Sequence, residues 1–231
     1  MATMLARPTC PASSTKSQSK ACTLSSREKN QAVAPTTCRP PAASSLLVVG
    51  GTGTGKTTLS GAILEQMART GHRVLTIEDT PELRHSAPNQ LALYVDRQRG
   101  GNYRQALFNA LRLRPDRIIV GELRDGDAAL ELLKAWNTGH NGGLATLHAN
   151  HPAAALARIE QLIAEVVPHP PRQLIAEAID LIVWIVRVTG DTDGRATRRV
   201  ACIAQVHNAL DARGDYVLAP LMHPHHRLDD P

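Results

Sequence analysis

A glycine-rich loop that ends in lysine and threonine is the strongest chemical signal in this sequence. Residues 50–57 read Gly-Gly-Thr-Gly-Thr-Gly-Lys-Thr, which matches the P-loop pattern G-x-x-x-x-G-K-[ST]. Glycines let the backbone turn successive N–H groups inward, where they bind phosphate oxygens at the positive end of a helix. The loop therefore predicts a site for ATP with Mg²⁺. Its expected phosphate-binding residues are Gly50, Gly51, Thr52, Gly53, Thr54, Gly55, Lys56, Thr57 and Thr58.

Three of these residues have distinct expected roles. Lys56 would reach the β- and γ-phosphates of the nucleotide, and the hydroxyl of Thr57 would bind Mg²⁺. Thr58 is placed for the α-phosphate. The loop follows an apolar, strand-like run and precedes a helical pattern, which is the context that the motif requires.

Carboxylates follow two other strand-like runs. Glu122 ends the sequence Arg-Ile-Ile-Val-Gly-Glu, in the place of a Walker B motif, although Gly121 holds the usual aspartate position. Glu78 and Asp79 follow the run at 74–77. Because the nucleotide cleft of an open α/β sheet forms at the carboxyl ends of its strands, we expect these carboxylates to meet the P-loop. Glu122 would orient or deprotonate the attacking water.

His148 and a group of arginines complete the candidate site. His148 ends another strand-like run and would report the γ-phosphate through a hydrogen bond. Most of the arginines in the central region are expected to form surface ion pairs, and one or two to act as arginine fingers across a subunit boundary. They are Arg84, Arg97, Arg99, Arg104, Arg112, Arg114 and Arg124.

Short apolar strands alternate with helical segments from Ser45 onward, which is typical of a parallel sheet covered by helices. The expected strands are 46–49, 74–77, 91–95, 118–120 and 144–148, and the expected helices are 57–69, 103–113, 127–137 and 152–167. A short helix after Pro171 and three strand-like runs, 179–188, 198–206 and 216–218, follow. The sequence therefore predicts an α/β P-loop NTPase fold with a mainly parallel sheet and a C-terminal β-rich section.

The ends of the chain have a different composition. Residues 1–45 are rich in Ser, Thr, Pro and Ala and contain no aromatic residue, so they bury too little apolar surface to offset their ordering entropy. We expect a disordered basic tail at 1–45, a P-loop domain at 46–219 and a second disordered tail at 220–231. The histidines of this last tail have no partner ligands spaced to complete a metal site.

Charge and hydropathy exclude several functional classes. The formal net charge of +5 for the 231 residues lies wholly in residues 1–45, so residues 46–231 are neutral. This distribution gives no strong reason to expect nucleic-acid binding. No apolar run reaches the roughly 20 residues of a membrane span, and the N-terminus lacks the apolar centre of a secretory signal. The four cysteines contain no CxxC pair, and a cytoplasmic protein is expected.

Four motifs in order resemble one family. The P-loop, the box Thr-Ile-Glu-Asp-Thr-Pro-Glu-Leu at 76–83, the segment 110–124 and the segment 138–150 are similar to the Walker A, Asp box, variant Walker B and His box of the type II/IV secretion traffic ATPases. Within that family they resemble the TrbB-type ATPases of conjugative type IV secretion. The resemblance covers residues 46–219.

The resemblance implies a RecA-like ATPase domain that assembles as a homo-hexamer or a mixed ring. It also implies a place on the cytoplasmic face of the bacterial inner membrane, with inner-membrane components of a conjugative apparatus as partners. There ATP hydrolysis would power pilus assembly and the transfer of DNA or protein. By position, Lys56 and Thr57 would hold phosphate and Mg²⁺, and the candidate catalytic residues are Glu122, Glu78, His148 and Arg124.

This sequence departs from the family in one respect. Members of the family have a further N-terminal domain before the P-loop domain, and here residues 1–45 stand in its place. The resemblance therefore leaves two functions open: an active motor subunit, or a truncated, catalytically impaired relic or regulatory subunit that joins the ring of a full-length paralogue.

Overall fold

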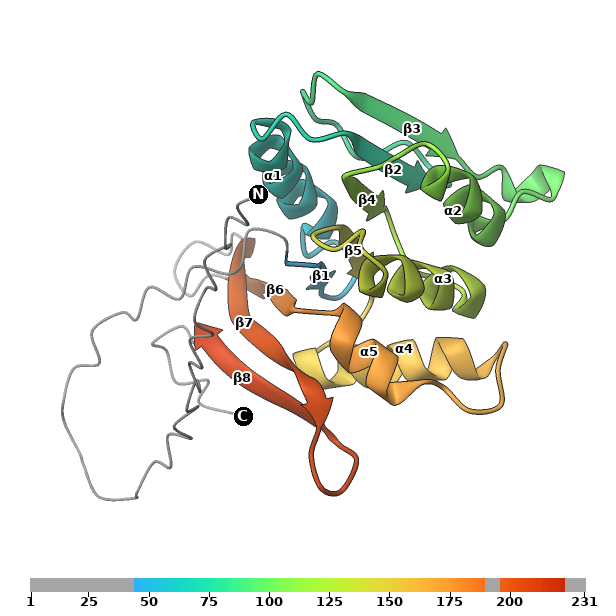
Figure 1. Ribbon diagram of the computed structural model, residues 1–231. Helices are drawn as coiled ribbons and strands as arrows, with labels where there is room; N and C mark the ends of the chain where they lie inside the picture. Colours follow the sequence, from blue (N-terminus) through green and yellow to red (C-terminus); the bar gives the residue numbers. More distant parts are fainter. Residues whose placement is uncertain (1–43, 190–195, 223–231) are drawn as a thin grey trace, which may run out of the picture. The chain divides into compact units, whose positions relative to one another are not determined.

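One mixed sheet organises the folded part of the chain (Figure 1). The structure is a computed structural model that describes residues 44–189 and 196–222. Within these residues the sheet has eight strands in the order β3-β2-β4-β5-β1-β6-β7-β8. They are β1 (Leu46–Val49), β2 (Val74–Glu78), β3 (Gln90–Tyr94), β4 (Arg117–Val120), β5 (Leu144–Leu147), β6 (Leu181–Thr189), β7 (Ala196–Leu210) and β8 (Tyr216–Met222).

The direction of the strands divides the sheet into two parts. The run from β3 through β2, β4, β5 and β1 to β6 is parallel throughout. The pairs β6–β7 and β7–β8 are antiparallel. The predicted α/β class, with a mainly parallel sheet and a C-terminal β-rich section, is confirmed.

Helices cover both faces of the sheet. The helices are α1 (Lys56–Ala68), α2 (Tyr103–Leu111), α3 (Gly126–Asn137), α4 (Pro152–Ala164) and α5 (Arg172–Ala178), with a 3₁₀ turn, η1, at Arg97–Arg99. Successive residues of a strand point to opposite faces. Thus Val48 packs in the core beneath α1, whereas Leu47 and Val49 pack in the larger core beneath the other helices. Figure 1 shows α1 alone on its side of the sheet.

Local sequence signals fix where the helices begin. The Asn102 side chain accepts a hydrogen bond from Gln105 N at the start of α2, and the Asp125 side chain accepts one from Ala128 N at the start of α3. Pro152 occupies the first turn of α4, where its missing N–H costs nothing. α1 begins after Gly55, whose φ of 95° favours glycine. Each of these caps places a helix start at the carboxyl edge of the sheet.

The expected elements are all present, with shifted ends. β7 extends to Leu210, four residues beyond its expected end at 206, and β8 continues to Met222 rather than ending at 218. η1 was not expected. Ser45, the last residue of the expected tail, is fully buried and its N–H donates to Asp180 Oδ2 at 2.6 Å. The rest of that tail, residues 1–43, and the C-terminal residues 223–231 with their three histidines lie outside the described residues.

A helix can cross a membrane only if it is long enough and apolar enough. Among the described residues, no helix combines the length and the apolar character that crossing a membrane requires.

Two glycines give a direct test of the packing. A Cβ on Gly126, at the start of α3, would collide with the backbone carbonyl of Leu162 in α4, whereas a Cβ on Gly61 in α1 would meet only Arg84 O at an ordinary 3.8 Å. We predict that Gly126→Ala lowers the free energy of unfolding by about 1–3 kcal/mol through overpacking. Gly61→Ala should raise it by about 0.5–1 kcal/mol, because alanine is the better helix former. Urea unfolding of both variants measures this, and equal stabilities would contradict the close contact of α3 with α4.

Candidate functional site

The P-loop connects β1 to α1 at the carboxyl edge of the sheet. Gly53 and Gly55 have φ values of 71° and 95°, a region that other residues rarely adopt. A Cβ on Gly50 would lie 2.5 Å from the carbonyl oxygen of Ile185 in β6, so the loop can follow this path only with glycine at that position. The Thr54 hydroxyl donates to Gly51 O at 2.9 Å and closes the loop on itself.

Lys56 carries a buried positive charge at the centre of the loop. Its side chain is 9% exposed, and Nζ donates to the carbonyl oxygens of Gly50 and Gly51, both at 3.0 Å. Burial lowers the pKa of Lys56, and the carboxylate of Glu122 opposes this shift. Among the described residues no carboxylate forms an ion pair with Lys56. An ammonium group held mainly by neutral carbonyls is suited to bind an anion that enters the loop.

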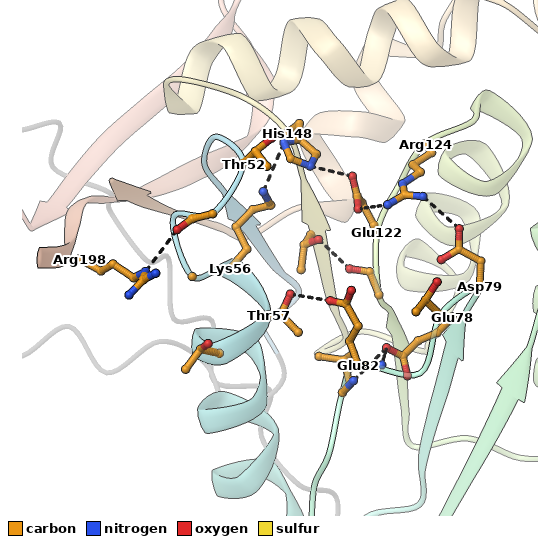
Figure 2. Close-up of a pocket in the computed structure, with 17 residues that line it drawn as sticks. Thr52, Lys56, Thr57, Glu78, Asp79, Glu82, Glu122, Arg124, His148 and Arg198 are labelled. Carbon is orange, nitrogen blue, oxygen red and sulfur yellow. Dashed lines mark hydrogen bonds and ion pairs between the residues drawn. The ribbon is translucent and has the colours of Figure 1, made fainter. Parts of the chain in front are cut away.

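A chain of polar contacts joins Lys56 to the ends of three other strands (Figure 2). Lys56 Nζ lies 3.4 Å from His148 Nδ1, and His148 Nε2 lies 3.0 Å from Glu122 Oε1. Glu122 Oε2 accepts from Arg124 at 2.7 Å, and Arg124 also reaches Asp79 at 3.2 Å. With Nδ1 accepting from Lys56, the tautomer of His148 that carries its proton on Nε2 satisfies both contacts. Both oxygens of Glu122 are thereby fixed in position.

The hydrogen bond from Arg124 to Glu122 also affects the titration of the arginine. That bond is the main cause that raises the pKa of Arg124. Arg124 therefore stays charged while its side chain is about half exposed.

A side-chain hydrogen bond joins the ends of β4 and β5. Thr146, buried in β5, donates to Gly121 O at 2.6 Å. The two strand ends that carry His148 and Glu122 are thus held together.

Two carboxylates of the Asp box, those of Glu78 and Glu82, have different surroundings. Glu78 is 4% exposed, and its Oε1 accepts hydrogen bonds from the backbone N–H groups of Glu82 and Leu83 at 3.1 and 3.0 Å. Burial raises the pKa of Glu78, and these two hydrogen bonds oppose the shift. Glu82, by contrast, accepts from the Thr57 hydroxyl at 3.0 Å. Glu78 therefore holds the backbone of the Asp box in place, and Glu82 contacts Thr57 of the P-loop.

These groups line one cavity of about 480 Å³. Figure 2 shows the P-loop with Lys56 near its centre, Glu122 and Arg124 on one side and Arg198 on the other. The lining residues are Thr52, Gly53, Gly55, Lys56, Thr57, Thr58, Glu78, Asp79, Thr80, Glu82, Leu83, Gly121, Glu122, Arg124, Thr146, His148 and Arg198. The structure thus brings all four candidate catalytic residues to the P-loop. Gly50, Gly51 and Thr54, which were also expected to bind phosphate, do not line the cavity.

Two lining residues whose side chains contact the P-loop, Glu82 and Arg198, were not predicted from the sequence. Glu82 lies in the Asp box, but no role was predicted for it. Its position, three residues after Asp79, is the signal that could have placed it in the loop that faces α1. Arg198 gave no usable signal, since it lies near the start of β7, more than a hundred residues after the P-loop. It reaches the site because β7 is antiparallel to β6, which brings the amino end of β7 to the carboxyl edge of the parallel strands.

The arginines of the central region mostly pair on the surface, as expected. Arg97 contacts Asp79 and Asp125, and Arg112 stacks over the ring of Phe108 at 4.4 Å. Arg99 pairs with Asp96, and Arg104 lies near Asp127 and Glu131. Whether any of them acts across a subunit boundary stays a prediction.

Comparisons with known proteins point to one family. The family model described as "Type II/IV secretion system protein" matches residues 12–220. The probable conjugal transfer protein TrbB of Sinorhizobium fredii is 44% identical over 174 residues, which cover 73% of this chain and 50% of that protein. The chain spans about half the length of the curated relatives that it matches.

Solved structures show the same fold. The VirB11 ATPase of the Brucella suis type IV secretion system, solved with sulphate, matches with a TM-score of 0.62 and 28% identity over 70% of this chain and 48% of that chain. The pilus retraction motor PilT with bound ADP matches with a TM-score of 0.55 and 25% identity, covering 68% of this chain and 47% of that chain. The predicted RecA-like fold is confirmed. The match over residues 12–220 shows that this chain belongs to the type II/IV secretion system protein family.

Proposed function

We propose that this chain is an ATP-binding and ATP-hydrolysing motor subunit of a conjugative type IV secretion system. One observation supports this most directly: Lys56, Thr57, Glu122 and His148, which come from three separate segments, line a single cavity at the carboxyl edge of the sheet. The similarity to TrbB and to the VirB11 ATPase favours conjugative secretion over other uses of a P-loop.

The P-loop would bind the phosphates of ATP. Backbone N–H groups of the loop and the start of α1 provide donors and a positive helix end. Lys56 would exchange its contacts with the carbonyls of Gly50 and Gly51 for charge-assisted contacts with phosphate oxygens, which are stronger. Thr58, exposed at the start of α1, is placed for the phosphate nearest the ribose.

The residues around Thr57 fit Mg²⁺. Its hydroxyl and the Glu82 carboxylate lie 3.0 Å apart, and both are oxygen ligands of the kind Mg²⁺ takes. The described residues contain no group of three His, Cys, Asp or Glu side chains that would hold a metal without help. This suits Mg²⁺, which usually binds through one or two protein oxygens, phosphates and water. When bound, Mg²⁺ would neutralise charge on the phosphates.

Glu122 would act on the water that attacks the terminal phosphorus. The new bond joins the water oxygen to phosphorus, the bridging bond to ADP breaks, and the water proton passes to Glu122 before it leaves with the products. His148 and Arg124 hold one oxygen each of this carboxylate. A γ-phosphate that draws Lys56 away would also remove its contact with His148, so His148 is suited to sense that phosphate.

Assembly and location extend this proposal. We also propose ring formation as a homo-hexamer or in a mixed ring, and contact with inner-membrane components on the cytoplasmic side, as the family resemblance implies. The similarity to an ATPase of a type IV secretion system supports a place in such an apparatus. The substrate moved would be DNA or protein of a conjugative system, as the similarity to TrbB suggests.

Substitution of Lys56 and Glu122 should separate binding from hydrolysis. Lys56→Ala should weaken ATP binding by at least about tenfold, because it removes a charge-assisted contact. Glu122→Gln should keep ATP binding and lower turnover by about 10²–10⁴-fold, the usual contribution of a general base. Calorimetric ATP binding and Mg²⁺-dependent phosphate release measure both effects.

Lys134→Ala and Glu131→Gln provide matched controls, since they change a surface ion pair on α3. Wild-type protein that hydrolyses ATP no faster than Glu122→Gln would contradict the motor proposal. If that protein still binds ATP through Lys56, the regulatory or relic alternative is supported instead.

Two of the Asp-box carboxylates, those of Glu78 and Glu82, should respond differently to loss of charge. Glu82→Gln should raise the Mg²⁺ concentration for half-maximal ATP binding by about tenfold, because a carboxylate at the metal is lost. Glu78→Gln retains an oxygen that accepts the two backbone hydrogen bonds, and it should change this concentration by less than about twofold. Mg²⁺ titrations of nucleotide binding distinguish the two, and a larger effect of Glu78→Gln would overturn the assignment of Glu82 to the metal.

A further inference from the structure

Two arginines are paired across neighbouring strands, and one of them contacts the P-loop. Arg187, in β6, and Arg198, in β7, are direct partners in the antiparallel register. Side chains of directly opposite residues lie on the same face of a sheet. On that face their neighbours along the strands, Ile185 and Val200, pack in the core beneath α1. The two guanidinium groups therefore belong to the face of the sheet from which the P-loop enters α1.

No carboxylate of the described residues neutralises this pair of charges. Within residues 44–189 and 196–222, neither Arg187 nor Arg198 forms an ion pair, although most arginines of the central region do. Like charges placed directly opposite in a sheet are destabilising. A bound anion would remove this repulsion.

Arg198 is the member of the pair that reaches the nucleotide cavity. Its Nε donates to Gly53 O at 3.2 Å, and its Cδ lies 2.9 Å from the place a Cβ would take on Gly55. Among the described residues, the remaining N–H groups of the guanidinium have no hydrogen-bond partner, and the side chain lines the cavity together with Thr58. Arg198 thus lies against the P-loop at Gly53 and Gly55, and its remaining N–H groups are available to bind a ligand.

The position of Arg198 indicates which part of a bound nucleotide it would contact. Figure 2 shows Arg198 on one side of Lys56 and the chain of His148, Glu122 and Arg124 on the other. The latter side holds the groups suited to the terminal phosphate and the attacking water. The opposite side is left for the phosphate that joins the nucleoside.

We propose that Arg198 is a nucleotide-binding residue whose guanidinium contacts the nucleoside-proximal phosphate of the bound nucleotide, with Arg187 adding to the positive potential there. This rests on the proposed function, because it takes ATP or ADP as the occupant of the cavity. The antiparallel strand β7 thereby becomes part of the nucleotide site, so occupancy of the P-loop is linked to the C-terminal β-rich section.

Binding of ADP to the full chain tests this proposal. Arg198→Gln should weaken ADP binding by about tenfold or more, the loss expected for one hydrogen bond to a charged group. It should also make the Kd less dependent on ionic strength, because one screened charge contact is gone. Arg198→Lys, which keeps the charge, should retain the steeper salt dependence. Arg213→Gln, in the turn beyond the far end of β7, is the matched control and should bind like wild type.

Each outcome has a distinct meaning. ADP affinity of Arg198→Gln equal to that of Arg213→Gln would overturn the inference. A loss of affinity with an unchanged salt dependence would also overturn it, because Arg198 would then act only through the Gly53 carbonyl. A wild-type chain that binds no ADP, or binds it as well after Lys56→Ala, would instead contradict the proposed function.

Discussion

The buried ammonium group of Lys56 is the charge around which the site is arranged. A lysine side chain that is 9% exposed and held by two neutral carbonyls has lost hydration without gaining a carboxylate partner among the described residues. Its pKa is lowered for that reason. Negative groups do lie nearby, but they are already engaged: Glu122 with His148 and Arg124, and Glu82 with Thr57. We therefore expect Lys56 to take its anionic partner from a bound ligand.

The sheet topology makes this arrangement possible. β1, β2, β4 and β5 are parallel neighbours or near neighbours, so their carboxyl ends meet at one edge and deliver the P-loop, the Asp box, Glu122 and His148 to the same place. The reversal at β6–β7 then adds the amino end of β7 with Arg198. Functional side chains from parallel strands and from an antiparallel strand therefore meet at this edge of the sheet.

Much of the fold and of the site could be predicted from the sequence. The alternation of apolar strands and helices predicted that the strands are mainly parallel, since each helical crossover returns the chain to the same direction. Gly50 to Thr58, Glu122 and His148 were found because their motifs are local. Glu82 was missed because only the folded loop, held by Glu78, shows which carboxylate reaches Thr57. Arg198 was missed because its position depends on strand register, which no local pattern specifies.

The most direct measurement is a structure of this chain with Mg²⁺ and a non-hydrolysable ATP analogue. The account predicts that Lys56 Nζ leaves the carbonyls of Gly50 and Gly51 and contacts the terminal phosphates, that Thr57 faces Mg²⁺, and that the nucleoside lies on the side of Arg198. An analogue bound elsewhere, or bound while Lys56 keeps its contacts with those carbonyls, would contradict it.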